Sequence, residues 1–512
     1  MDSVTVYHAN SPQPATELGV SLGINRLSLS VKATPTEVWC RIFEFVATGA
    51  FRHVLLLCKI CRRWREIAIT CGSLWNNIVV FNPRVVHITM VEMWCRRAGA
   101  YPLSVDIFAS YTHLRSTTNI AVMLCLFSLI MAQTNTLHSF SFTYPATLIT
   151  PTTLPTPSAF TCLRKLVLQC ADYSEDAARY LISLFREVQL TRLECGSLHN
   201  VLAPPPILFD RPTNSLTHLR VDVASPADVP LLLSRCPRLL TLDVFFNHQR
   251  GETVGVCSFE TALTCLILRG DIKAKIALLG RGLFPNLTTV DCGNNALDDM
   301  SISPIVLAQQ TSGFRLSKLT ASCVGDSLDQ HGAPDCLLAL HTILGHLTYF
   351  DVSLPAFSSR IDQVLDLPNV REMVIRFNSY KLLPAPFVIP QFRVPNLGRL
   401  RLEDCSSLMD QVLDHLETSN CRLKEVSIKL HNNIRPNDVH PIRFLRAPFA
   451  SVEILDITGP LSAYLLELLA TTPTVFPSLA CICVAPSMFC TDFIHRIRMQ
   501  RTLIHVKIAV RS

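Results

Sequence analysis

Apolar residues recur along most of the chain in the order apolar-x-x-apolar-x-apolar. Neighbouring copies start 23 to 31 residues apart, with a mean of about 26. Because successive side chains of a strand point to opposite faces, each copy predicts a short strand that buries one face. The first positions of the copies are Leu137, Leu163, Leu190, Leu216, Leu239, Leu263, Leu287, Leu316, Leu347, Val370, Leu397, Leu423, Val452 and Leu479.

Prolines and helical segments complete the repeating unit. A proline lies two residues before several copies, where its fixed φ predicts a turn into the strand. These prolines are Pro237, Pro285, Pro368, Pro395 and Pro477. Between copies, DAARYLISLFREV from Asp176 and DQVLDHLETS from Asp410 predict helices. Alternation of strands and helices favours a parallel inner sheet.

The repeat length lies within or just above the range of leucine-rich repeats, although it varies too much for a clean consensus. We therefore predict an α/β leucine-rich-repeat-like solenoid with a curved parallel sheet over residues 137–512. An ordinary multidomain α/β protein is the alternative, since Leu-rich sequence produces some matches by chance. The segments 143–158 and 202–215, rich in proline, are expected to be loops.

A separate apolar pattern occupies the N-terminal part. Pro35 suits a first helical turn and Thr34 can cap it, so TPTEVWCRIFEFV at 34–46 predicts a helix. A second apolar stretch from Phe51 to Ile69 predicts one or two more short helices. The apolar positions of the first helix exceed what one small core needs: Val38, Trp39, Ile42, Phe43, Phe45 and Val46. Such a small core is expected to be covered by a partner.

The series TPTEVWCRIFEFV…LLLCKICRRWREIA…SLWNNIVV, from Thr34 to about Val80, resembles the F-box. The resemblance implies a small all-α module that docks the Skp-type adaptor and, through it, the cullin core of ubiquitin ligases. The positions that match its docking residues are Pro35, Ile42, Phe43, Leu56, Cys58 and Trp64. The family usually has Leu where this chain has Thr34, and one buried leucine contributes about 1.5–3 kcal/mol. Docking is therefore expected to be weaker than in typical members.

These patterns divide the chain into four regions. They are a flexible segment at 1–32, the F-box at 33–80, an N-terminal cap of the solenoid or linker at 81–136, and the irregular solenoid at 137–512. VEMWCRRAGAYPLSV at 91–105 is similar to the segment that follows the F-box in many fungal members of the basidiomycete type.

Composition and charge narrow the class of protein. Hydrophobic residues make up 49% and charged residues 17%, which excludes a disordered chain. A net charge of +6 without a long basic run does not favour nucleic acid. No signal peptide is apparent, and the apolar run Ala121–Met131 is too short to cross a bilayer and predicts a buried helix. We expect a soluble protein with reduced cysteines, in the cytoplasm or the nucleus or both, and no membrane partner.

Sequence signatures of chemistry are absent: there is no phosphate loop, dinucleotide fingerprint, nucleophile elbow or zinc-protease helix. Cys58 and Cys61 form one Cys-x-x-Cys pair without a second pair, so we expect one helix that packs two small side chains and no metal. No cofactor is expected. The basic residues Lys59, Arg62, Arg63 and Arg65 predict a solvated helix face, with phosphate binding as the alternative.

If the motif forms inner strands, its intervening positions face the concave surface. The fifth residue of each copy would then form a middle row. Its members are Val167, Glu194, Arg220, Asp243, Ile267, Asp291, Thr320, Asp351, Val374, Arg401, Ser427, Asp456 and Cys483. We expect a protein substrate to contact Asp243, Asp291 and Asp351, which form an acidic stretch, and Arg399 and Arg401, which form a basic spot. An ordinary solvated face is the alternative.

Together these features predict a non-catalytic receptor: the substrate-recognition subunit of an SCF-type ubiquitin ligase (Skp, cullin and F-box), which holds an unidentified protein for modification by other subunits. One alternative is a scaffold with the same two modules that acts outside ubiquitin ligases. Another is a hydrolase on an α/β fold, in which the repeats have been misinterpreted.

Overall fold

The architecture comes from a computed structural model of the chain. Its contacts divide the chain into unit 1, Met1–Phe140, and unit 2, Ser141–Ser512. The segment 1–32 lies outside the described residues. Those residues are 34–47, 51–110, 112–133, 135–144, 160, 162–170, 193–199, 215–223, 226–246, 259–280, 282–292, 303–322, 345–354, 364–377, 391–403, 409–429, 449–458, 467, 469, 471–472, 476–484 and 505–508.

Unit 1 begins with short helices and continues with strands and longer helices. Its elements are α2 (Thr36–Ala47), α3 (Phe51–Ile60), α4 (Arg62–Thr70), η1 (Gly72–Trp75), β1 (Asn77–Phe81), α5 (Val85–Ala98), β2 (Leu103–Phe108), η2 (His113–Arg115) and α6 (Thr117–Met131). Strands β1 and β2 are parallel neighbours. The boundary with unit 2 falls within β3 (Leu137–Tyr144), so Thr143, which we had expected in a loop, belongs to a strand.

The helices of unit 1 follow the apolar pattern with two differences. Helix α2 begins at Thr36, and the carbonyl of Pro35 accepts the first helical bond, from the Trp39 N–H at 3.3 Å. The stretch Phe51–Ile69 is broken at Cys61, which is extended and caps α4 by accepting the Trp64 N–H at 3.4 Å. The prediction that Cys58 and Cys61 share one helix is therefore wrong. The predicted buried helix at 121–131 is confirmed as the C-terminal part of α6.

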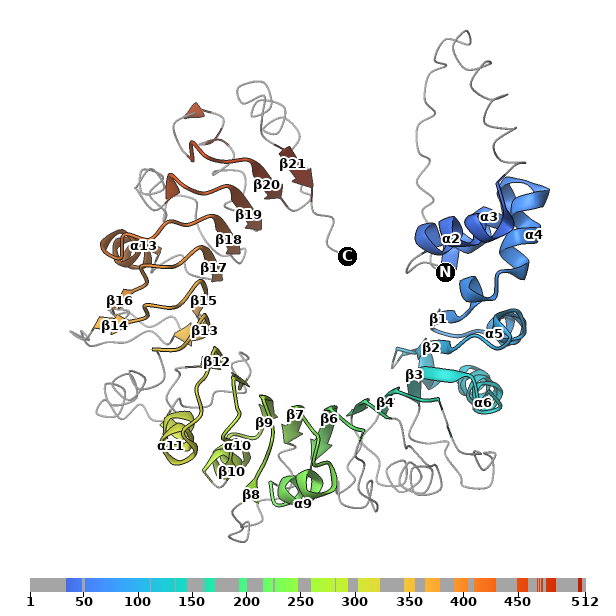
Figure 1. Ribbon diagram of the computed structural model, residues 1–512, viewed down its shortest axis with the longest axis horizontal. Helices are drawn as coiled ribbons and strands as arrows, with labels where there is room; N and C mark the ends of the chain where they lie inside the picture. Colours follow the sequence, from blue (N-terminus) through green and yellow to red (C-terminus); the bar gives the residue numbers. More distant parts are fainter. Residues whose placement is uncertain are drawn as a thin grey trace. The chain divides into compact units, whose positions relative to one another are not determined.

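Unit 2 contains a long, entirely parallel sheet in which consecutive repeats contribute neighbouring strands (Figure 1). In order across the sheet these are β4 (Lys165–Cys170), β5 (Cys195–His199), β6 (His218–Val223), β7 (Thr241–Phe246), β9 (Cys265–Gly270), β11 (Thr289–Asp291), β12 (Lys318–Ser322), β13 (Tyr349–Leu354), β15 (Glu372–Phe377), β17 (Arg399–Glu403), β18 (Glu425–Lys429), β19 (Ile454–Thr458), β20 (Cys481–Val484) and β21 (His505–Ile508).

Helices and small strand pairs lie on one side of these strands (Figure 1). Helix α13 confirms the predicted helix from Asp410, whereas the predicted helix from Asp176 lies outside the described residues. The helices are α9 (Asp228–Arg235), α10 (Ile272–Leu279), α11 (Ser303–Ser312) and α13 (Met409–Thr418), and the pairs are β8 (Phe259–Glu260) with β10 (Gly282–Leu283) and β14 (Val364–Asp366) with β16 (Gln391–Arg393). The chain is thus a mixed α/β protein with N-terminal helices and a long parallel sheet, compatible with a leucine-rich-repeat-like solenoid.

The repeat motif accounts for how the strands are buried and where they start. The three apolar positions of a copy are buried, as at Leu263, Leu266 and Leu268, while the side chains between them lie on the other face of the sheet. The predicted proline turns are present in the structure. At Pro237, for example, the N–H of Leu239 donates to the carbonyl of Cys236 at 3.1 Å, which closes a four-residue turn.

The predicted start of one copy of the motif, Leu190, is wrong. Strand β5 pairs Ser197 with Val167 and Arg220, so this copy starts at Leu193 instead of Leu190, and Ser197 replaces Glu194 in the middle row. The fourth position of the copy is Gly196, which hid the pattern. A Cβ there would lie 3.2 Å from Leu219 Cδ1, so the packed core leaves little room for a side chain.

Candidate functional site

One side of α2 is apolar and exposed. Phe45 is 82% exposed and Ile42 40% exposed, and Val38 and Val46 lie on the same side at helical spacing. An adjacent side, about 100° around the helix, carries Trp39 and Phe43, which are buried. Helix α2 therefore supplies the core of the helical module with one side and leaves an equally apolar side uncovered.

Helix α3 repeats this division. Val54 and Leu57 are buried, whereas Leu55, Leu56 and Ile60 are exposed. We name the exposed residues of the two helices the apolar surface, which consists of Val38, Ile42, Phe45, Val46, Leu55, Leu56 and Ile60. A small helical module rarely exposes so many large apolar side chains unless a partner covers them.

The predicted docking residues fall into three groups in the structure. Pro35, Ile42 and Leu56 are exposed, and Cys58 and Trp64 are half-buried. Phe43 is fully buried, so it supports the module from within and cannot contact a partner in this conformation. The predicted docking residues did not include Phe45, Val46, Leu55 and Ile60. For Phe45, the helical spacing of Val38, Ile42 and Phe45 was a sequence signal that these residues share one side of the helix.

An aromatic cluster joins α2 to α4. The Trp64 ring lies 4.9 Å from that of Trp39 and 5.0 Å from that of Phe43, measured between ring centroids. These distances are those of favourable aromatic pairs. Trp64 therefore packs on the inner side of α2, which limits how much of it a partner could touch.

The basic residues of α4 have separate roles. Arg62 is ion-paired with Glu66 at the surface, as expected of a solvated face. Arg63 instead donates from Nη2 to the Thr34 carbonyl at 2.8 Å, and Arg65 donates from Nε to the Cys58 carbonyl at 2.8 Å. Arg65 is exposed, as a solvated face requires, although it also binds the main chain at the end of α3. The prediction is incorrect for Arg63, which is partly buried against the segment before α2.

Metal binding has no support in the described part of the chain. Cys61 is exposed between two helices, and burial raises the pKa of the Cys58 thiol, although Arg97 and Arg65 oppose this. Among the described residues, no three His, Cys, Asp or Glu side chains are grouped to hold a metal ion.

In the part of the chain that the structure describes, no helix combines the length and apolar character required to span a bilayer.

The middle row of unit 2 is present in register across the sheet. Each described member is the direct neighbour of the next, apart from the replacement of Glu194 by Ser197. The row is Val167, Ser197, Arg220, Asp243, Ile267, Asp291, Thr320, Asp351, Val374, Arg401, Ser427, Asp456, Cys483 and Lys507.

The first ion network on this face surrounds Asp243. Its carboxylate is buried and lies 3.1 Å from Arg269 Nε and 3.3 Å from Arg220 Nε. Burial raises the pKa of Asp243, because the two arginines offset the loss of hydration only in part. Asp243 is therefore ion-paired with these two arginines, and its buried carboxylate is not open to a partner.

A second network is centred on Arg376, which is ion-paired with Asp351 and lies 2.6 Å from Glu403. The Tyr349 hydroxyl donates to Asp351 Oδ2 at 3.2 Å. Burial opposes ionisation of Glu403, but the hydrogen bond and charge of Arg376 outweigh it and lower the pKa of this carboxyl. Asp351, like Asp243, is buried among its partners, which the sequence did not predict.

The predicted basic spot remains accessible. Arg399 is 63% exposed and lies 3.1 Å from Glu425, and Arg401 is partly exposed and lies 2.6 Å from Glu403. Asp291 is half-buried. Of the predicted substrate-contacting residues, Arg399 is thus the most open to a partner.

A scan against protein-family models found no match to this chain, and a search of curated proteins found none either.

Proposed function

We propose that this chain is the substrate-recognition subunit of an SCF-type ubiquitin ligase. Helices α2, α3 and α4 would form an F-box-like module that docks a Skp-type adaptor. Unit 2 would be a leucine-rich-repeat-like solenoid with a curved sheet, whose face binds a protein substrate. The observation that carries this proposal is the apolar surface on α2 and α3.

A partner that covered the apolar surface would gain substantial free energy. Burying a large apolar side chain is worth about 1.5–3 kcal/mol, and Phe45, Leu56 and Ile60 are each more than half exposed. The free energy of covering several such side chains therefore adds up to a substantial contribution to affinity. The F-box resemblance assigns the partner, because its matching residues Ile42 and Leu56 lie on this surface.

The role proposed for unit 2 is recognition without catalysis. Its sheet face presents exposed Arg399 and partly exposed Arg401 beside buried ion networks, as suits a surface that binds protein. A bound substrate held near the rest of the ligase would be modified faster because its effective concentration is raised. Such a subunit would act in the cytoplasm or the nucleus.

The test is a titration of the full chain with a purified Skp-type adaptor. Ile42→Asp and Leu56→Asp place a charge in the apolar surface and should weaken binding by at least a hundredfold, since burying an unpaired carboxylate is costly. Val85→Asp is the matched control, because Val85 is also exposed but lies at the start of α5, where an acidic residue is tolerated. Equal binding by all four proteins, or none by wild type, would refute the proposal.

The rival scaffold function is favoured by Thr34, which lacks the apolar side chain that the F-box family usually has before Pro35. Addition of a cullin to the adaptor complex distinguishes the two functions. A ternary complex would support the ligase subunit, whereas adaptor binding without cullin recruitment would support the scaffold.

A further inference from the structure

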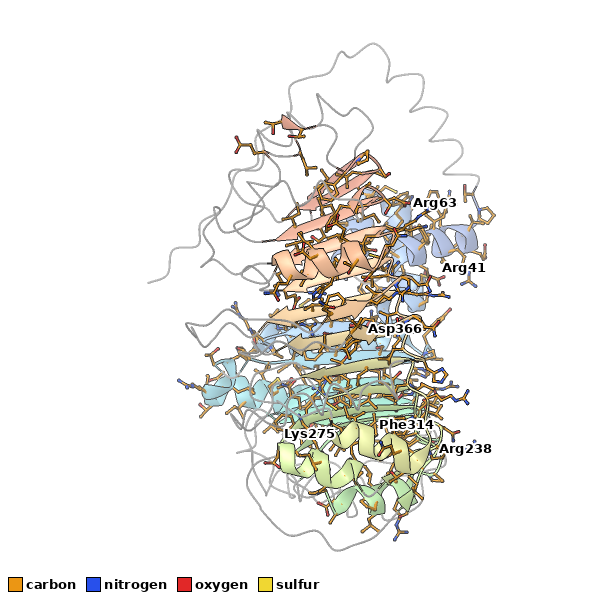
Figure 2. The ribbon with its side chains drawn as sticks, turned by 90° about the vertical axis from the view of Figure 1, so that its left-hand side faces the viewer. Arg41, Arg63, Arg238, Lys275, Phe314 and Asp366 are labelled. Carbon is orange, nitrogen blue, oxygen red and sulfur yellow. The ribbon has the colours of Figure 1, made fainter. Side chains whose placement is uncertain are left out.

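Arg63 connects the start of α4 to the chain segment that precedes α2. Its Nη2 atom donates to the Thr34 carbonyl at 2.8 Å in a partly buried position. Thr34 directly precedes Pro35, whose carbonyl accepts the first hydrogen bond of α2 from Trp39. Figure 2 shows Arg63 and Arg41 within this helical part of unit 1. The contact thus holds the chain at the point where α2 begins.

The two residues after Arg63 also contact the helices that carry the apolar surface. Trp64 packs on Trp39 and Phe43 of α2, with centroid distances of 4.9 and 5.0 Å. Arg65 donates to the Cys58 carbonyl near the end of α3 at 2.8 Å. Three consecutive residues of α4 therefore contact the segment just before α2, the inner side of α2 and the end of α3.

Arginine suits the contact at Thr34. This position has no large apolar side chain to anchor the segment in the core. A hydrogen bond from a guanidinium is stronger than one between neutral groups, and Arg63 is 29 residues away in sequence, so it fixes the segment to another helix.

We propose that Arg63 is a positioning residue for adaptor docking, which holds Thr34 and Pro35 so that Pro35 and Val38 are presented in the binding orientation. This inference rests on the proposed function of α2, α3 and α4. A surface that is ordered before binding has a higher affinity, because no further conformational entropy is lost when the partner associates. Arg63 would act through the start of α2 without itself contacting the adaptor.

The experiment compares adaptor binding by the full-length wild type, Arg63→Gln, Arg63→Lys and Arg62→Gln. Loss of the charge-assisted hydrogen bond to the Thr34 carbonyl should weaken binding by Arg63→Gln about tenfold. Lysine keeps a cationic donor, so Arg63→Lys should retain most of the wild-type affinity for the adaptor. Arg62→Gln is the matched control, because this neighbouring side chain is 91% exposed and pairs only with Glu66 among the described contacts. The midpoint of thermal unfolding of Arg63→Lys should equal that of the wild type, because lysine keeps the donor.

Amide hydrogen exchange of Trp39 gives a readout that does not need the adaptor, since this N–H is bonded to the Pro35 carbonyl. Faster exchange in Arg63→Gln alone, together with the weaker binding, would support the inference. The inference would be overturned if Arg63→Gln bound the adaptor as tightly as the wild type. It would also be overturned if Arg63→Lys lost as much affinity as Arg63→Gln and both variants unfolded at a lower temperature than the wild type. If the wild type does not bind the adaptor, the proposed function fails and so does this docking role, while the exchange data still show whether Arg63 orders the start of α2.

Discussion

Two neighbouring residues of α2 have opposite environments. Phe43 is fully buried against Trp39 and Trp64, while Ile42 is 40% exposed. Both match docking positions of the F-box, so the resemblance alone does not separate them. Their side chains point about 100° apart around the helix, and only one of the two directions meets the aromatic cluster.

Phe43→Ala should destabilise unit 1 by about 3–5 kcal/mol, because it leaves a cavity between two tryptophan rings. Ile42→Ala should cost less than about 1 kcal/mol, since much of that side chain is already in water. Urea unfolding followed by tryptophan fluorescence measures both, because all four tryptophans lie in unit 1. Equal effects of the two substitutions would contradict the burial of Phe43 and the exposure of Ile42.

His415 of α13 is a residue whose protonation should affect stability. Its ring lies edge-on to Phe392 at 4.9 Å, and its buried Nδ1 atom has no hydrogen-bond partner among the described residues. Burial lowers the pKa of His415, with a smaller opposing effect of Asp414. The folded state therefore favours the neutral imidazole.

The sign of the pH effect follows from this direction. Between the folded pKa and the ordinary value of about 6.5, the unfolded chain binds more protons. The free energy of unfolding should thus decrease as pH falls below about 6.5, and His415→Gln should lose this part of the dependence. Urea midpoints of both proteins at several pH values, followed by circular dichroism, would measure it. Parallel pH profiles would show that His415 does not contribute.

At the scale of elements, parallel strands in register bring together charges from different repeats. Arg376 on β15 lies between Asp351 on β13 and Glu403 on β17. Arg399 on β17 lies between Glu372 on β15 and Glu425 on β18, four residues before Glu403 along the same strand. The first arrangement is largely buried and the second is exposed. Their energetic contributions should therefore differ although the residue types are the same.

Arg376→Met should destabilise unit 2 by about 3–5 kcal/mol, because it leaves two buried carboxylates without their shared cation. Arg399→Met, at an exposed site, should change stability by at most about 1 kcal/mol. Chemical denaturation followed by circular dichroism, with the tryptophan signal of unit 1 recorded in parallel, would separate the units. A small effect of Arg376→Met would mean that the carboxylates are neutral or hydrated.

At the scale of the whole molecule, the two units have different kinds of surface. Unit 1 leaves large apolar side chains exposed on α2 and α3, whereas the sheet face of unit 2 carries charged and polar side chains, many of them already paired. The first kind suits a partner that is bound for a long time, and the second suits a more selective contact. This difference is consistent with the proposed division between adaptor docking and substrate recognition.

Much of the repeat unit could be predicted from local sequence. The apolar-x-x-apolar-x-apolar motif located strands such as β9 and β17, and proline preceded the turns into β7 and β11. Strand alternation and turn formation depend on residues within a few positions of each other, so these features are visible in the chain itself. The copy at Leu193 was misplaced because Gly196 contributes no apolar side chain to the pattern.

Local sequence was enough to predict the period of the strands, the helical character of the N-terminal module and, apart from Ser197, the members of the middle row. Packing of the elements places Phe43 in the core, surrounds Asp243 and Asp351 with arginines and brings Arg63 to Thr34. The two kinds of feature differ in how far apart along the chain the interacting residues lie. Burial and charge pairing depend on residues more than twenty positions apart, whose approach is known only once the elements have packed.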